Sequence, residues 1–198
     1  MRANFTARMV TGFVLGAILL SHGQTGSDPD PASAIDTAHS VLTVRVYKTG
    51  LFSAFAHDHE IRAPIQNGVI DEAKNTVEFT VDARTLRVLD PETSEKDRAE
   101  IQSTMLGPKV LDSEKVPEIR FRSTSIGEGG DDRLIVRGDL TLHGQTHPVK
   151  VNVAGRDGHY LGSARLSQKD FGISPVSIAG GSIKVKDEVF VEFEIFAK

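Results

Sequence analysis

The sequence contains no cysteine and no tryptophan among its 198 residues. Without cysteine the chain cannot form disulfides, use a thiol as a catalytic nucleophile or bind a metal through thiolates. It also cannot carry a lipid anchor attached to an N-terminal cysteine. The folded part must therefore be held together by its hydrophobic core, and a domain of about 170 residues can bury enough surface to do so.

The sequence also has no apolar run long enough to span a bilayer, which takes about 20 residues. The apolar run Met9–Leu20 is shorter, with Arg2 and Arg8 before it and small or polar residues after it up to Gly23. This order is typical of a secretory signal peptide. We therefore predict a signal peptide over residues 1–23 and a periplasmic or secreted mature protein without a membrane span.

Basic residues are fewer than acidic ones, with 23 lysines and arginines against 27 aspartates and glutamates. Removal of residues 1–23 takes away two arginines and no acidic residue, which changes the formal net charge from −4 to −6. This balance argues against nucleic acid as a partner and against electrostatic docking on anionic membranes. Residues 24–34 are rich in glycine, proline and small polar residues, so we expect a flexible leader before a single domain over residues 35–198.

Most of that domain alternates apolar and polar residues, as in Val77-Glu78-Phe79-Thr80-Val81. Alternation with period two predicts strands with one buried face and one solvated face. The fold class predicted is all-β, with apolar faces that close on each other as a sandwich or a barrel. The predicted strands are Val41–Tyr47, Glu60–Ile70, Thr76–Ala83, Glu118–Ile126, Leu134–His143, Val149–Gly155, Tyr160–Ser167 and Gly181–Ala197.

One segment, Thr93–Met105, lacks this alternation and is rich in helix-forming residues. Thr93 or Ser94 can cap its start, and Gly107-Pro108 ends it. We predict one helix packed at the surface of the β structure, with one edge buried.

The hairpin near Gly144 allows its register to be predicted. If Gly144-Gln145 forms a two-residue type II′ turn, Leu140 faces Val149 and Leu142 faces His147, so the apolar faces coincide. A slip by one residue would place Leu140 opposite a polar or proline residue. This register also places His143 and His147 on opposite faces of the hairpin.

His57 and His59 are the residues that most clearly indicate a local chemical role. On a strand they project from the same face, which suits two imidazoles that bind one Zn or Cu ion. The alternative is an exposed turn whose histidines bind backbone groups. A metal needs further ligands, and the candidates are His39, Glu60, His143 and His147.

No motif predicts catalysis. The chain has no G-x-S-x-G elbow, no G-x-G-x-x-G and no P-loop, and its carboxylates are spread over outward strand faces and turns. We therefore expect a protein that is not an enzyme.

The apolar interior is the remaining candidate site. It is either a filled core or a cavity, and eight strands would form a barrel just wide enough to be filled or to hold one small ligand. Its residues are mostly valine and leucine with a few phenylalanines, whose side chains are only moderately large and so fill an interior less completely. The predicted interior residues are Val77, Phe79, Val81, Phe121, Leu140, Leu142, Val149, Val151, Val153, Val191 and Phe193.

Four segments resemble motifs of the YceI-like family in the right order. They are the strand opening Ile35–Ser40, the strand Val116–Ser123, the hairpin Gly138–Thr146 and the turn Lys169–Ile173. The resemblance implies an eight-stranded antiparallel lipocalin-like barrel with one helix packed over it. It also implies a non-enzymatic, exported protein that holds a polyisoprenoid or isoprenoid-quinone-like lipid in the barrel, as carrier or sensor.

The chain departs from the family pattern after Phe52, where small and polar residues usually follow. Here the sequence continues with Ser53–Ala56 and then the histidine pair, which could hold a lipid head group or mark the metal site considered above. Phe190 and Phe196 on the outward side of the last strand indicate a homodimer contact.

Overall fold

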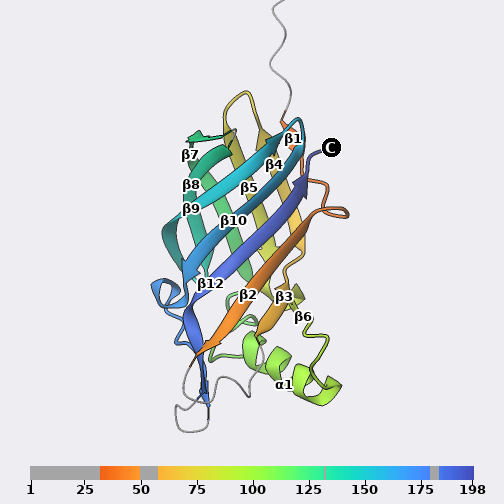
Figure 1. Ribbon diagram of the computed structural model, residues 1–198, viewed down its shortest axis with the longest axis vertical. Helices are drawn as coiled ribbons and strands as arrows, with labels where there is room; N and C mark the ends of the chain where they lie inside the picture. Colours follow the sequence, from red (N-terminus) through yellow and green to blue (C-terminus); the bar gives the residue numbers. More distant parts are fainter. Residues whose placement is uncertain (1–31, 50–57, 132, 179–182) are drawn as a thin grey trace, which may run out of the picture.

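The structure is a computed structural model that describes residues 32–49, 58–131, 133–178 and 183–198. In these residues the chain forms one curled antiparallel sheet and one α-helix below its lower end (Figure 1). The all-β class is therefore confirmed. The predicted signal peptide and most of the predicted leader lie outside the described residues.

The described residues contain twelve strands where eight were predicted. They are β1 (Ser33–Ala34), β2 (Val41–Thr49), β3 (His59–Arg62), β4 (Ile65–Asp71), β5 (Thr76–Asp82), β6 (Arg87–Val88), β7 (Glu118–Gly130), β8 (Arg133–Leu142), β9 (Gln145–Arg156), β10 (His159–Ser167), β11 (Ser177–Ile178) and β12 (Ile183–Phe196). Three of the extra strands, β1, β6 and β11, have two residues each. Such short strands leave no periodic pattern in a sequence.

The fourth difference is a break in the predicted strand Glu60–Ile70. Pro64 has no backbone N–H to donate to a ladder, so the segment divides there into β3 and β4. β3 pairs with β2, whereas β4 pairs with β5. Two stretches of one extended segment therefore pair with strands from opposite ends of the sheet.

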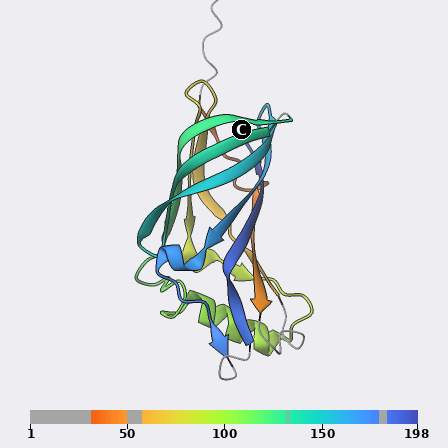
Figure 2. The same cartoon turned by 60° about the vertical axis from the view of Figure 1, so that its left-hand side comes forward.

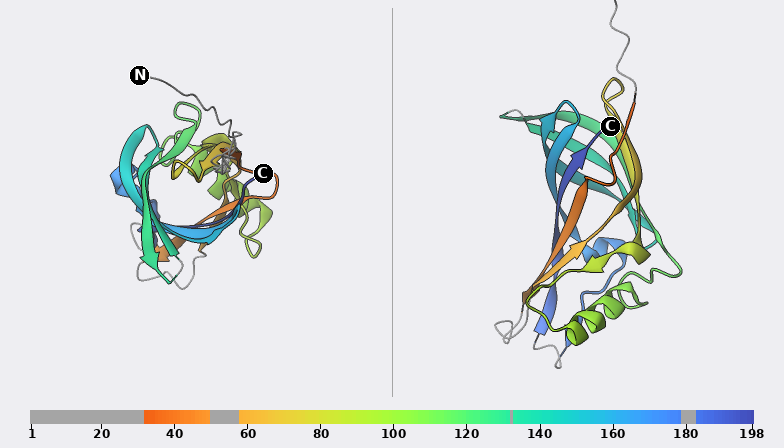
Figure 3. Two further views of the ribbon diagram at one scale, coloured as in Figure 1. Left: turned by 90° about the horizontal axis from the view of Figure 1, so that it is seen from above. Right: turned by 90° about the vertical axis from the view of Figure 1, so that its right-hand side faces the viewer.

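Because β3 and β4 follow each other in the chain and pair at opposite ends of the sheet, the sheet curls round on itself. The strand order is β1-β4-β5-β7-β8-β9-β10-β12-β2-β3-β6, and β11 pairs with β12 alone. At the upper end, β1 pairs with β4, and Ile35 forms a bridge to Ala197 just after β12. The view from above in Figure 3 shows the strands surrounding a central space. β1 also shows that regular structure begins within the predicted leader.

The register of the β8–β9 hairpin differs from the prediction. The turn is His143-Gly144, whose φ angles of 51° and 72° fit a type I′ turn. Leu140 therefore faces His147 instead of Val149. The prediction was wrong by two residues, and a shift of two keeps every side chain on its predicted face, so apolar patterning could not detect it.

The helix prediction is confirmed by α1 (Glu95–Leu106). Ser94 Oγ accepts a hydrogen bond from the backbone N–H of Asp97 at 3.1 Å, and Gly107 caps the C-terminus. Figures 2 and 3 show α1 at the lower end of the sheet. The Gln102 side chain fixes it there, because its amide accepts from Val88 N–H and donates to the Leu86 carbonyl, both at 2.8 Å.

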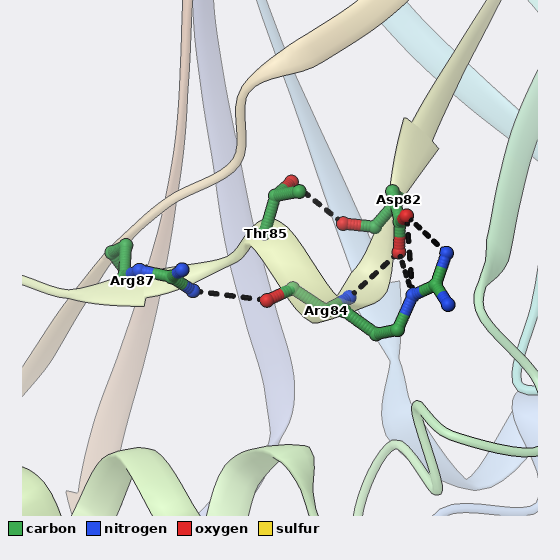
Figure 4. A network of polar contacts seen from close by, with 4 residues as sticks. All are labelled: Asp82, Arg84, Thr85 and Arg87. Atoms are coloured by element: carbon green, nitrogen blue, oxygen red, sulfur yellow. Dashed lines mark hydrogen bonds and ion pairs between the residues drawn. The ribbon is translucent and has the colours of Figure 1, made fainter.

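A short 3-10 helix, η2 (Ala83–Thr85), turns the chain from β5 towards this end (Figure 4). The Asp82 carboxylate caps it by accepting from Arg84 N–H at 3.0 Å and from the Arg84 guanidinium at 2.6 Å. These bonds hold the pKa of Asp82 below its ordinary value, chiefly through the guanidinium. Thr85 Oγ1 donates to the Asp82 carbonyl at 2.7 Å, which closes the turn.

Candidate functional site

The inner face of the curled sheet encloses an apolar cavity of about 260 Å³. Every long strand contributes to its wall, because alternate residues on each strand point inward. All eleven predicted interior residues lie on this wall. They are Val77, Phe79, Val81, Phe121, Leu140, Leu142, Val149, Val151, Val153, Val191 and Phe193.

The prediction missed other lining residues of two kinds. Leu42, Val44 and Val46 of β2 show the same alternation as the residues that were predicted, so the sequence carried their signal. A second group lies outside the long strands and has no periodic pattern that could identify it. It comprises Leu86, Met105, Val110, Leu111 and Ile173. Met105 belongs to α1, so the helix contributes to the wall at the lower end.

Two glycines give the cavity part of its width. A Cβ atom added at Gly162 would lie 2.1 Å from Cζ of Phe193, and one added at Gly138 would lie 2.6 Å from Cζ of Phe121. Each ring therefore covers a position on a neighbouring strand that has no side chain. With a larger residue beneath them, the rings would have to move.

Among the lining residues that the structure describes, only Tyr160 and Gln168 carry a polar side-chain group. Gln168 lies in the 3-10 helix η3 (Gln168–Phe171) that follows β10, and its amide donates to the Lys186 carbonyl at 2.8 Å. Tyr160 lies at the other end of β10, where its hydroxyl donates to the Glu72 carboxylate. The two polar groups therefore mark the two ends of this strand.

The surroundings of Tyr160 keep its hydroxyl protonated. Burial disfavours the phenolate, and the hydrogen bond to Glu72 and the charge of that carboxylate oppose ionisation further. Together they raise the pKa of Tyr160 to about 12. The cavity wall is therefore uncharged near neutral pH.

The predicted metal site is only partly described, because His57 lies outside the described residues. His59 Nδ1 is 2.6 Å from the carboxylate of Asp90, whose side chain is only 2% exposed. The other oxygen of that carboxylate accepts from Glu60 N–H at 2.8 Å. These groups line a polar pocket of about 480 Å³ together with Arg45 and Lys48. This pocket is separate from the apolar cavity.

Of the other candidate ligands, Glu60 lines the same polar pocket as His59, whereas His39, His143 and His147 lie elsewhere. His39 pairs with Asp36, and Glu60 pairs with Arg45. His143 and His147 both contact Phe171, one through its carbonyl at 3.1 Å and the other edge-on with its ring. Within the described ranges, no group of three or more histidine or acidic side chains is arranged to hold a metal ion.

The two outward phenylalanines named for a homodimer contact are partly covered by their own chain. The Arg165 guanidinium lies over the Phe190 ring at 5.9 Å, and His159 stacks on Phe196 with ring centroids 4.4 Å apart. The dimer contact stays a prediction. No helix in the described part of the chain is long and apolar enough to cross a membrane.

Known proteins resemble this chain in sequence and in fold. A UPF0312 protein of Vibrio cholerae is 32% identical over 170 residues, which span 80% of this chain and 84% of that protein. A UPF0312 protein of Vibrio vulnificus is 32% identical over 176 residues, with the same shares covered. The crystal structure of Burkholderia cenocepacia BcnA matches with a TM-score of 0.58 at 19% identity, covering 83% of this chain and 99% of that one. That likeness shows the fold.

The pattern of the YceI-like domain matches residues 34–197 and so spans the whole sheet. Together with the relatives above 30% identity, this match means that the chain belongs to the YceI-like family.

Proposed function

We propose that this protein is an exported, non-enzymatic lipid-binding protein that holds a polyisoprenoid or isoprenoid-quinone-like chain in its apolar cavity, as carrier or sensor. The observation that supports this most is the composition of the cavity wall, where Tyr160 and Gln168 are the only described lining residues with polar side-chain groups. A ligand of such a cavity must be almost entirely hydrocarbon, because an unpaired polar group buried there would lose its hydrogen bonds to water.

The free energy of binding would come from burial of hydrocarbon. Transfer of apolar surface out of water contributes about 25 cal/mol per Å². The methyl branches of an isoprenoid would pack against valine, leucine and phenylalanine side chains, which dominate the wall. No hydrogen bond is needed along the chain.

The same wall supports binding over catalysis. A general acid or base must titrate near the working pH, and an activated nucleophile needs a base beside it. In the described part of the wall the one titratable group is Tyr160, and its pKa of about 12 leaves it neutral. The proposal of export rests on the N-terminal sequence alone.

Lipid extraction tests this proposal. We expect the full chain, purified from its native host, to release a polyisoprenoid or isoprenoid quinone into organic solvent, detected by mass spectrometry at about one molecule per chain. Ala164 is buried on the cavity wall in β10, so Ala164→Phe should plug the cavity and remove that lipid. Leu161 lies on the same strand but is 50% exposed, so Leu161→Phe is the matched control.

The result against the proposal is a wild-type protein that carries no lipid and takes up none when it is added. Equal lipid contents in the Ala164→Phe and Leu161→Phe variants would place the lipid outside the cavity and would also count against it.

One observation favours the alternative of a metal-binding protein. Metal-binding histidines usually donate their second ring nitrogen to a carboxylate, and His59 meets Asp90 in this way. Metal analysis of the wild type against a His57→Ala, His59→Ala double variant decides the alternative. Equal Zn and Cu contents in the two proteins would reject it.

A further inference from the structure

At the upper end of the sheet, one hydrogen bond between side chains joins the β4–β5 turn to β10. Glu72 lies in the turn between β4 and β5, and Tyr160 lies at the start of β10. Four strands, β5, β7, β8 and β9, separate β4 from β10 in the sheet. Figure 1 shows the β4–β5 turn and this end of β10 both at the upper end. On the other side, where the sheet closes, β1 and β12 lie between β4 and β10. The bond therefore does not join neighbouring strands.

The position of this bond gives it contact with any occupant of the cavity. The Tyr160 side chain is itself part of the apolar wall, while its hydroxyl reaches the exposed carboxylate of Glu72. An apolar chain in the cavity that carries a polar group at its upper end would present that group to this bond. A hydroxyl group could accept from Tyr160 and donate to Glu72 at once, so neither partner would lose a hydrogen bond.

The charges around this end disfavour an anion. Glu72 is joined by Asp157, whose charge also opposes ionisation of Tyr160, and by Asp71. Lys74, two residues after Glu72, is held by Asp71 at 2.7 Å. Arg156 is the register partner of His159 and lies with it on the outer face of the hairpin. A phosphate here would face the carboxylates of Glu72 and Asp157, and like charges at close range oppose binding.

We propose that Glu72 and Tyr160 form the head-group site of the cavity, and that this site selects an uncharged, hydroxyl-bearing isoprenoid over its phosphate ester. This inference rests on the proposed lipid-binding function and adds the class of head group. The ligand's hydroxyl replaces the direct bond between the two side chains when it binds.

Competition binding to the delipidated full chain tests this site with three probes of equal chain length: geranylgeraniol, geranylgeranyl phosphate and the hydrocarbon phytane. We expect the wild type to bind the alcohol about tenfold more tightly than the phosphate, since like charges at close range oppose binding. Glu72→Gln should narrow this ratio by strengthening phosphate binding. Tyr160→Phe should weaken binding of the alcohol about three- to tenfold and leave phytane unchanged, because only a hydrogen bond is lost.

Gln168→Met is the matched control, because Gln168 is the polar lining residue at the opposite end of β10. It should leave the ratio of alcohol to phosphate affinity unchanged. The inference is overturned if the phosphate binds as tightly as the alcohol, if Glu72→Gln and Tyr160→Phe leave the ratio unchanged, or if Gln168→Met changes it instead. Equal binding of all three probes would overturn the head-group site alone. Binding of none would overturn the proposed function as well.

Discussion

At the scale of single residues, the width of the cavity depends on positions that lack a side chain. Gly162 and Gly138 lie beneath the rings of Phe193 and Phe121, and neither ring could stay in place over a larger residue. The sequence shows these glycines only as interruptions in strands. The register shows their role, because Gly162 is the direct partner of Phe193, and Gly138 lies opposite Ser123, two residues from Phe121.

Gly162→Ala tests this role. The added methyl group would force the Phe193 ring into the cavity, and we expect the free energy of unfolding to fall by about 1 kcal/mol, at the low end for overpacking because the ring tip can move. Chemical denaturation measures the change. Gly127→Ala is the control, because a Cβ there has no neighbour within 4 Å, and an equal loss in both variants would contradict the explanation.

Asp82 gives a prediction about pH. Its pKa is lowered in the folded chain, first by the hydrogen bond from the Arg84 guanidinium, so the folded state binds a proton less readily than the unfolded state. The stabilisation is therefore present above the ordinary pKa of 3.8 and is lost as the pH falls through the lower folded value. Asp82→Asn should reduce stability at about pH 7 and have little effect at about pH 2.

Urea denaturation of both proteins at the two pH values measures this difference. Asparagine can still accept the backbone N–H of Arg84, so the variant isolates the charge of the carboxylate. A loss of stability that is the same at both pH values would show that the charge contributes nothing.

At the scale of elements, strand patterning predicted where the long strands lie and which way their side chains point. All eleven predicted interior residues face the cavity, and α1 is capped by Ser94, one of the two predicted caps. The break at Pro64 and the two-residue register error were not predicted. The break depends on the strands with which β3 and β4 pair, which the alternation of residues does not reveal. The register depends on the turn at His143-Gly144, where both φ angles are positive.

The corrected register places two cations opposite each other on the outer face. Arg137 of β8 is the direct partner of Lys150 of β9, and both side chains are exposed. Like charges in this position destabilise a sheet, whereas opposite charges stabilise it. Lys150→Glu should therefore raise the free energy of unfolding by about 0.5 kcal/mol.

Thermal and urea denaturation at low salt measure this gain, and high salt should reduce it because exposed charges are screened. Lys150→Gln removes the repulsion without adding attraction and should give a smaller gain. A loss of stability in Lys150→Glu would contradict the observed register.

At the scale of the whole molecule, the cavity is a property of no single strand. It exists because a curled sheet closes through β1, β3 and β4 while α1 and the loops before β7 supply the lower part of the wall. The sequence left a filled core and a cavity as equal alternatives. Patterning identifies which side chains point inward but does not say whether they meet in the middle.

The folded protein should be more stable against unfolding when a lipid fills its cavity. Binding to the folded state alone raises stability in proportion to the logarithm of ligand concentration over Kd. We expect delipidated protein to melt at a lower temperature than protein as purified. Added geranylgeraniol should bring the melting temperature back up. The Ala164→Phe variant, whose cavity is plugged, should show neither effect in differential scanning calorimetry.

The most direct test of the central claim is a crystal structure of the full chain purified from its native host without delipidation. We expect continuous electron density along the cavity, with the regular methyl branches of an isoprenoid, running from Met105 towards Tyr160. Side chains that meet across the middle and leave no room for a chain would contradict it.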